Sequence, residues 1–373
     1  MPELNDYLRL TAQWGGSDLH LKAGGPAYIR VSGALQEVEG LPALSPADTA
    51  AFVAEILPHN QREAYERGGE ADFAHAVAGL GRYRVAVFRQ RGSTGLVMRR
   101  VQSDNQTLEE LQLPPSVRKL SEEHRGMVLV TGPTGSGKTT TTAAMLGHIN
   151  ATRRCHIVTI EDPIEILHRD NLALIDQREV GVDTCDFRAA MRSVARQDPD
   201  VIFIGEMRDT ETVAAALQAA ETGHFVMSTL HTTDAAQTVS RVIDLFPPHQ
   251  QEQTRIALAE TLKGIVSQRL VPRIDGGLVA VVEVLVMTLR MREFVLDPDK
   301  TDQLPDAIAE GEYYGMQTFD QHLLHLYRDG VISMDAALAA ASSPHDFRIM
   351  TRGITPAPAA PAAPAASAPS TAG

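Results

Sequence analysis

Four continuous hydrophobic runs give the second part of the chain its clearest pattern. They cover residues 127–130, 156–160, 201–204 and 225–230, and the stretches between them are compatible with helices. Strands that are apolar along their whole length, rather than at every second position, are typical of a parallel sheet covered on both faces. This pattern predicts an α/β domain built on a mostly parallel sheet.

The first hundred residues alternate short strands and helices instead. Residues 27–33 and 82–88 are interpreted as strands, and residues 46–66 as one helix. We predict a small α/β domain over residues 1–101. A stiff linker with two consecutive prolines is expected to follow over residues 102–117.

The remaining residues are predicted to be helical and then disordered. The clearest helical stretch after the sheet covers residues 251–268, and the larger domain is expected to extend over residues 118–350. Residues 351–373 consist mainly of Ala, Pro, Ser and Thr, a composition that predicts a disordered tail. The most apolar run, residues 278–287, is too short to cross a bilayer and contains Glu283.

Charge and cysteine content narrow the class of protein. A formal net charge of −13 argues against a large basic surface for nucleic acid and against tight binding to an anionic membrane. Cys155 and Cys185 form no C-x-x-C pair and are interpreted as free thiols. The N-terminus lacks the apolar core of a signal peptide, so we predict a cytoplasmic protein.

A phosphate-binding loop follows the first of the four hydrophobic runs. Residues 132–139 match G-x-x-x-x-G-K-[ST] at every defined position. Glycines let the backbone point its N–H groups at a phosphate, and Lys138 adds a positive charge. Thr139 offers a hydroxyl to Mg²⁺ and opens a helix whose N-terminus faces the anion. The sequence therefore predicts binding of ATP and Mg²⁺ by Gly132, Pro133, Thr134, Gly135, Ser136, Gly137, Lys138, Thr139 and Thr140.

Polar side chains follow the other three hydrophobic runs. Because the carboxyl ends of parallel strands meet at one edge of a sheet, Glu161, Glu206 and His231 are expected to converge on the triphosphate. Glu206 is predicted to hold Mg²⁺ through water, and Glu161 to polarise the attacking water. His231 is a candidate sensor of the γ-phosphate. His224, at the other end of its strand, is the weaker candidate on geometry.

Some acidic residues near these strand ends have possible structural roles instead of catalytic ones. Asp162 and Glu165 are candidates for orienting partners or for capping the next segment. An acidic residue after a strand is often only a loop charge or a helix cap, and Asp209 is predicted to cap a helix that begins at Thr210.

Two arginines share one face of the strand at residues 82–88. Arg82 and Arg84 alternate there with the apolar side chains of the opposite face. The face is either solvated or a source of arginine fingers that reach a triphosphate held by a neighbouring subunit. The second alternative makes hydrolysis depend on assembly.

Several segments, in order along the chain, together resemble the ATPases of type II/IV secretion and type IV pili. The segments are residues 16–21, 81–85, 159–165, 198–209, 221–234 and 315–320. The resemblance implies a PAS-like N-terminal domain, a RecA-like ATPase domain with C-terminal helices, and a homohexamer that turns a rotor at the cytoplasmic base of a pilus. It also implies that Glu161 is the catalytic base, that Glu206 serves Mg²⁺, and that His224 and His231 line the nucleotide site.

The branch of this superfamily that retracts pili is the most similar. Assembly and type II secretion ATPases are longer and usually carry a four-cysteine zinc module, which this chain lacks. Retraction ATPases carry a segment with two arginines after the sheet, and residues 290–297 correspond to it. These residues keep one arginine, Arg292, and lose the other. Residues 343–350 are more similar to PilU, an accessory retraction ATPase. The expected partners are further copies of the chain, an inner-membrane platform protein and a paralogous pilus ATPase, and contact with the membrane is expected only through partners.

Two other functions remain open at this point. A conjugation-type ATPase that handles DNA requires a basic path, which the acidic composition does not indicate. A partner that binds ATP without hydrolysing it is disfavoured by the intact Lys138, Thr139, Glu161 and Glu206.

Overall fold

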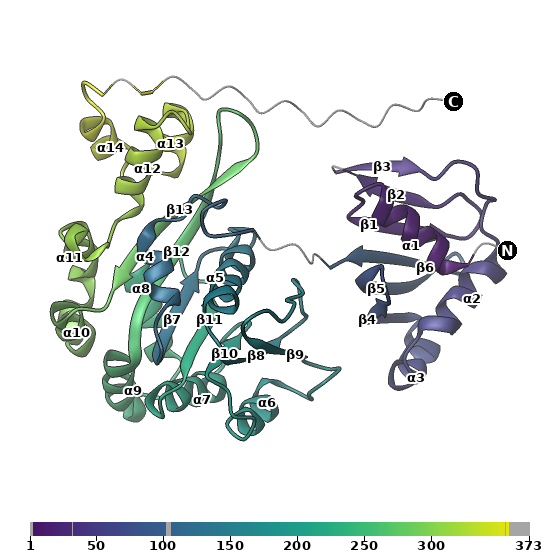
Figure 1. The fold of residues 1–373 in the computed structure, drawn as a ribbon, viewed down its shortest axis with the longest axis horizontal. Coiled ribbons are helices and arrows are strands. Elements are labelled where there is room, and N and C mark those ends of the chain that lie inside the picture. The colour runs from purple at the N-terminus through teal and green to yellow at the C-terminus, as the bar shows by residue number, and fades with distance from the viewer. Residues whose placement is uncertain (1–2, 32, 102–105, 355, 358–373) are drawn as a thin grey trace. The chain divides into compact units, whose positions relative to one another are not determined.

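The structure, a computed structural model, describes residues 3–31, 33–101, 106–354 and 356–357 (Figure 1). Most of the predicted tail and part of the predicted linker lie outside the described residues. The chain divides into two compact units, one up to residue 104 and one from residue 105, with the short stretch Glu165–Leu167 grouped with the first.

The N-terminal unit is a six-stranded antiparallel sheet with helices. Its strand order is β3-β2-β1-β6-β5-β4. The elements are α1 (Leu4–Gln13), β1 (Asp18–Lys22), β2 (Tyr28–Val31), β3 (Ala34–Glu37), α2 (Pro46–Ile56), α3 (His59–Gly68), β4 (Glu70–Val77), β5 (Gly81–Gln90) and β6 (Ser93–Arg100).

One helix predicted in this unit is wrong in extent. The residues from 46 to 66 form two helices, α2 and α3, because Pro58 interrupts them. A residue before proline avoids the helical conformation, and Leu57 accordingly is extended, with φ −68° and ψ 118°.

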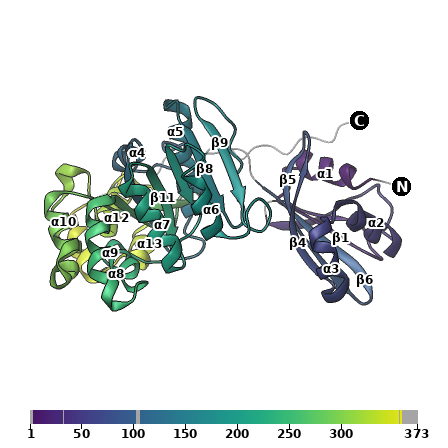
Figure 2. The ribbon, with the colours of Figure 1, turned by 90° about the horizontal axis from the view of Figure 1, so that it is seen from below.

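The larger unit is built on a seven-stranded sheet with the order β13-β12-β7-β11-β10-β8-β9 (Figures 1 and 2). Neighbouring strands are parallel except β13, which is antiparallel to β12. The four hydrophobic runs lie in buried strands, so the predicted α/β fold is confirmed. The strands are β7 (Gly126–Thr131), β8 (His156–Glu161), β9 (Leu174–Glu179), β10 (Val201–Ile204), β11 (Phe225–Leu230), β12 (Leu262–Pro272) and β13 (Leu278–Val286).

Helices cover both faces of this sheet. Alternate residues of β7 divide between two cores, since Met127 and Leu129 pack with α6 to α9 while Val128 and Val130 pack with α4 and α5. The helices are α4 (Pro115–Ser121), α5 (Lys138–Thr152), α6 (Phe187–Val194), α7 (Thr210–Glu221), α8 (Ala235–Asp244) and α9 (Pro248–Thr261). Among the described residues, no helix is long and apolar enough to cross a membrane.

The prediction of one helix over residues 251–268 is also wrong. Helix α9 ends at Thr261, and the chain continues directly into β12. Gly264 fits this strand because an added Cβ there would lie 2.7 Å from the carbonyl oxygen of Leu285 on β13. Strand β12 adds a further parallel strand, which lies between β7 and the antiparallel edge strand β13.

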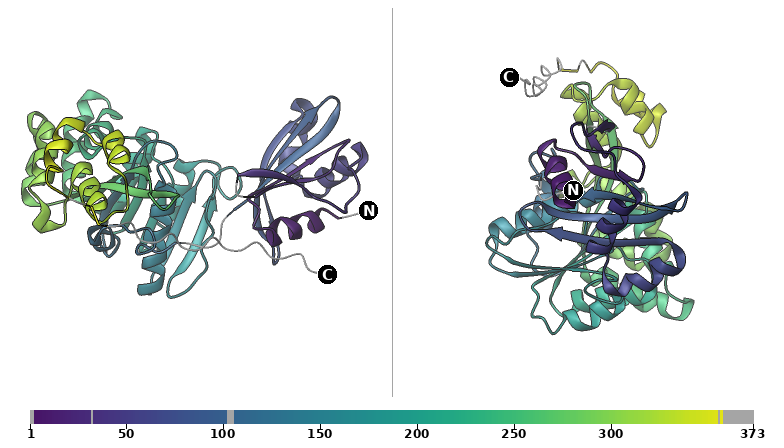
Figure 3. Two further views of the ribbon diagram at one scale, coloured as in Figure 1. Left: turned by 90° about the horizontal axis from the view of Figure 1, so that it is seen from above. Right: turned by 90° about the vertical axis from the view of Figure 1, so that its right-hand side faces the viewer.

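The C-terminal helices pack on the far part of the β12–β13 hairpin (Figures 1 and 3). Val271, Val279 and Val281 of the hairpin share a core with Phe319 and Phe347 of these helices. The helices on the hairpin are α12 (Phe319–Arg328), α13 (Met334–Ala340) and α14 (Pro344–Met350). Before them, α10 (Leu289–Leu296) and α11 (Leu304–Ala309) pack in the core that α6 to α9 share, and short 3-10 turns lie at Pro298–Gln303 and Glu312–Tyr314.

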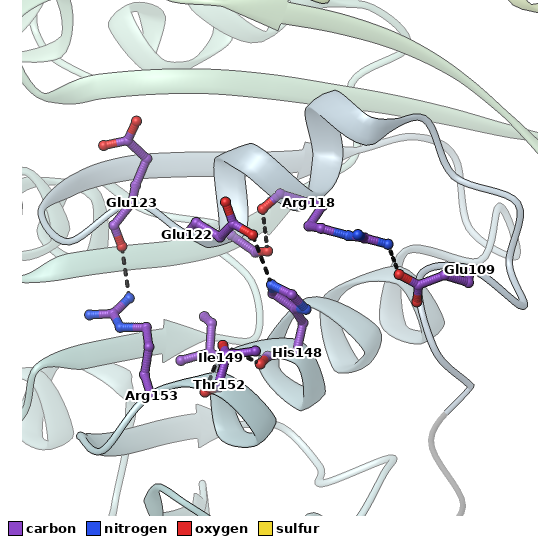
Figure 4. Close-up of polar contacts among 9 residues, drawn as sticks. Glu109, Arg118, Glu122, Glu123, His148, Ile149, Thr152 and Arg153 are labelled. Carbon is purple, nitrogen blue, oxygen red and sulfur yellow. Dashed lines mark hydrogen bonds and ion pairs between the residues drawn. The ribbon is translucent and has the colours of Figure 1, made fainter.

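The segment that leads into the larger unit is tied to α5 (Figure 4). Helix α4 begins at Pro115, inside the stretch assigned to the linker. Arg118 pairs with Glu109. Immediately after α4, Glu122 Oε1 lies 3.2 Å from His148 Nε2 on α5. Farther along, Arg153 donates to the carbonyl of residue 123 at 2.9 Å.

Candidate nucleotide site

The phosphate loop joins β7 to α5 and has little room for side chains. Gly132 and Gly137 have φ angles of 148° and 85°, which only glycine adopts readily. An added Cβ at Gly132 would lie 2.5 Å from Ser136 Oγ. The buried Lys138 ammonium donates to the carbonyl oxygens of Gly132 at 2.7 Å and Pro133 at 3.0 Å. The loop is therefore closed around its own lysine.

The residues of the loop fit a phosphate group. The Ser136 hydroxyl is buried and has no hydrogen-bond partner, which is unusual for a buried polar atom. Ser136 stands two residues before Lys138, just ahead of the N-terminus of a 15-residue helix whose dipole favours an anion. Thr139 and Thr140 occupy the first turn of that helix. This chemistry matches the phosphates of a nucleotide.

His231 connects the loop to the end of a neighbouring strand. Its Nε2 lies 3.2 Å from Glu206 Oε1, and its Nδ1 lies 3.5 Å from Lys138 Nζ. Glu206 follows β10, His231 follows β11, and both strands run parallel to β7. The sheet therefore brings Lys138, Glu206 and His231 together at its carboxyl edge.

Glu206 is held in the ionised state. Burial raises the pKa of its carboxyl, but hydrogen bonds and charges from Arg208 and His231 outweigh burial, so the pKa lies below its usual value. Arg208 Nη2 is 2.7 Å from Glu206 Oε2. An ionised carboxylate beside the loop is the kind of oxygen ligand that Mg²⁺ takes.

Glu161 lies at the end of the next strand with one oxygen fixed. Thr159 Oγ1 and Gln177 Nε2 both donate to Glu161 Oε1, at 2.7 and 3.0 Å. Residues 160 and 204 are paired in β8 and β10, so Glu161 and Glu206 leave adjacent strands. Gly205 permits this approach, since an added Cβ would lie 3.3 Å from the Glu161 Cα.

His224 lies away from this cluster. It precedes β11, whose first residue pairs with Gly126 and whose last pairs with Thr131 just before the phosphate loop. A six-residue strand, roughly 20 Å long, therefore separates His224 from the loop. The His224 Nδ1 contacts the carbonyl of Ala219 at 3.0 Å. Within one chain His224 thus lies at the opposite end of β11 from the phosphate loop, and its role at a nucleotide site stays a prediction.

Arg82 and Arg84 lie on β5 of the N-terminal unit. The opposite face of β5 is buried through Tyr83, Val85 and Val87, as the alternation predicts. Arg84 is exposed and Arg82 is half-buried. Their action on a neighbouring subunit stays a prediction.

Sequence reasoning missed several polar residues around the site. A cavity of about 360 Å³ adjoins the cluster, and α8 contributes Gln237 and Arg241 to its lining beside Arg208. Gln177 contacts Glu161 from β9, and Gln268 contacts the phosphate loop from β12. Arg208 stands two residues after Glu206, inside the segment 198–209 that carries the family resemblance, so the sequence could have indicated it. The others become visible only when the strands are paired.

A phosphate loop at the edge of a parallel sheet, with carboxylates on the neighbouring strands, defines a P-loop ATPase. Residues 77–310 match the family described as type II/IV secretion system protein. The chain belongs to this family, and the predicted resemblance is confirmed.

Individual relatives agree with this assignment. The retraction ATPase PilT of Pseudomonas aeruginosa is 44% identical over 92% of this chain and 100% of its own length. The pilus ATPase PilU of the same organism is 42% identical over 94% of this chain and 91% of its own length. A solved structure of the pilus retraction motor PilT with bound ADP covers 94% of this chain and all of its own, with a TM-score of 0.85 and 41% identity.

Proposed function

We propose that this chain is an ATP-hydrolysing motor that drives retraction of type IV pili. The observation that carries the proposal is the contact of His231 with both Lys138 of the phosphate loop and Glu206 of the next strand but one. A 44% identical retraction ATPase that matches along its whole length supports the retraction branch.

Each residue has a role that its contacts favour. Lys138 leaves the loop carbonyls to bind the outer phosphates of ATP, and the loop N–H groups bind the others. Thr139 and, through water, Glu206 would hold Mg²⁺, which would supply positive charge against the phosphates. His231, once Lys138 has moved, stays close enough to hydrogen-bond the γ-phosphate.

Glu161 acts as the base. Thr159 and Gln177 both donate to one carboxylate oxygen and so orient the carboxylate, which polarises the water that attacks the γ-phosphate. The water oxygen bonds to the γ-phosphorus and its proton goes to Glu161, while the bond from the γ-phosphorus to the bridging oxygen breaks, so that ADP and inorganic phosphate are released.

The active form is a homohexamer at the cytoplasmic face of the pilus machine. Arg82 and Arg84 reach the triphosphate of a neighbouring copy, so that hydrolysis follows closure around the ring. An inner-membrane platform protein receives the motion. A PilU-like accessory motor is the second candidate, because PilU matches 94% of the chain at nearly the same identity.

Two experiments test the proposal. Purified full-length protein is expected to hydrolyse ATP, and Lys138→Ala and Glu206→Gln to abolish turnover, whereas the exposed control Glu252→Gln leaves it unchanged. Negligible turnover of the assembled wild type would contradict the motor function.

Deletion of the gene in its own host tests the direction. Many surface pili without surface movement are expected from a retraction motor. Bald cells would show that the chain extends pili instead, and normal pili with normal movement would support the accessory role.

A further inference from the structure

Strand β12 brings a buried glutamine against the phosphate loop. Ser267 of β12 pairs with Thr131 of β7, so Gln268 comes level with the point where β7 enters the loop. The Gln268 side chain is 2% exposed. Its Nε2 donates to the carbonyl oxygen of Ser136 at 2.7 Å, and its Oε1 accepts from Thr141 Oγ1 at 2.7 Å. One amide thus joins the loop to the first turn of α5.

The loop glycines make room for this residue. An added Cβ at Gly132 would lie 2.4 Å from the Gln268 carbonyl oxygen, and one at Gly137 would lie 2.8 Å from Gln268 Nε2. Both distances are too short for real atoms. The loop therefore lies directly on Gln268, and two glycines of its motif are required by this contact as well as by their φ angles.

The hydrogen bond from Gln268 fixes the direction of one peptide group. In a planar trans peptide the C=O and the following N–H point to opposite sides. With the Ser136 carbonyl directed at Gln268, the N–H of Gly137 is directed away from β12. N–H groups oriented in this way are the donors from which a phosphate-binding loop is made.

We propose that Gln268 is a positioning residue for nucleotide binding, which acts through the loop and does not touch the nucleotide. It holds the peptide between residues 136 and 137 in the orientation that donates to the phosphates of a nucleoside diphosphate or triphosphate. The inference rests on the proposed role of the loop in binding phosphate.

Two substitutions separate this role from simple packing. Gln268→Leu keeps the volume but neither donates nor accepts. Gln268→Glu keeps the shape, but its ionised carboxylate faces the Ser136 carbonyl without a proton to donate. A protonated carboxyl restores the donor, and burial favours that neutral form. The glutamate variant therefore reports on the hydrogen bond through its pH profile.

The experiment is ADP titration of the full-length protein by calorimetry between about pH 6 and pH 8.5. Because a buried hydrogen bond is lost, both variants are expected to bind ADP about tenfold to a hundredfold more weakly than the wild type at pH 8.5. The Gln268→Glu affinity is expected to recover toward wild type as the pH falls, while Gln268→Leu stays weak. The matched control is Gln253→Leu on the exposed side of α9.

The outcomes distinguish the two proposals. Wild-type protein that binds no ADP, or Lys138→Ala that binds it normally, contradicts the proposed function. If those controls behave as expected, wild-type affinity in both Gln268 variants overturns the inference. A loss in Gln268→Glu that is equal at all pH values overturns it too, since a packing defect does not titrate. If Gln268→Leu fails to fold, the pH dependence of ADP affinity in Gln268→Glu decides whether the inference holds.

Discussion

Glu283 is a buried acid whose protonation should control stability. It lies on β13 with 6% of its surface exposed, and its Oε1 accepts from the N–H of Ala235 at 2.9 Å. Burial raises the pKa of Glu283 from an ordinary 4.5 to about 7; Asp234 and Asp320 add to this shift, while the Ala235 N–H and Arg269 oppose it. The carboxyl is thus half-ionised near neutral pH.

The change we consider is Glu283→Gln, which imitates the protonated acid and keeps the acceptor for Ala235. The unfolded chain loses the Glu283 proton near pH 4.5 and the folded chain near pH 7. The stability that the protonated Glu283 contributes is therefore fully present below pH 4.5 and is lost as the pH rises through 7. The difference between these two pKa values corresponds to a limit of about 3 kcal/mol. Between pH 6 and pH 8.5 the stability of the variant should rise relative to the wild type by about 1 kcal/mol.

Urea unfolding of the wild type and the variant at several pH values measures this gain. Far-UV circular dichroism is the suitable probe, because the sole tryptophan, Trp14, lies in the other unit. Glu252→Gln on the surface of α9 is the matched control. A stability difference between Glu283→Gln and wild type that is constant across this pH range would refute the reasoning, since it would show that Glu283 does not titrate there.

Three further predictions concern other parts of the chain. Arg84→Ala is expected to reduce hydrolysis by the assembled ring more than it weakens ATP binding, and equal ATPase rates in mutant and wild-type rings would contradict a role across subunits; Arg82→Ala in parallel identifies which arginine acts. Gln177→Leu removes a charge-assisted hydrogen bond from Glu161 and should lower kcat about tenfold with little change in KM, as steady-state kinetics can test. Asp209→Ala removes the cap of α7 and should lower the free energy of unfolding by about 1 kcal/mol in urea titration, whereas an unchanged midpoint would show that the cap is dispensable.

The sheet and the phosphate loop could be predicted because their signals are local. Four strands are mainly apolar and buried along nearly their whole length, and polar residues at or just after their ends are carried by the parallel arrangement to the same edge. His231 reaches Lys138 and Glu206 through that arrangement alone. Asp209 was likewise predictable, because a helix cap depends only on neighbours in sequence.

Strand β12 was not predictable in the same way. Residues 262–268 continue a helical pattern from α9, and only pairing with β7 and β13 shows them to be a strand. The roles of Gln177 and Gln268 follow from such pairing across long separations in sequence. Glutamine in a strand carries no signal of its own, because the residue that it will contact is set by the register of the sheet.

The contacts of α4 with α5 have a mechanical meaning. Helix α5 starts at the phosphate loop, while its far half is tied through His148 and Arg153 to the chain that enters the unit. The Arg118–Glu109 pair fastens the chain ahead of α4 to that helix in turn. Helix α5 is therefore anchored near both ends, at the phosphate loop and at the chain that enters the unit. A shift of the helix at its phosphate-loop end would have to move, or break, the contacts at its other end.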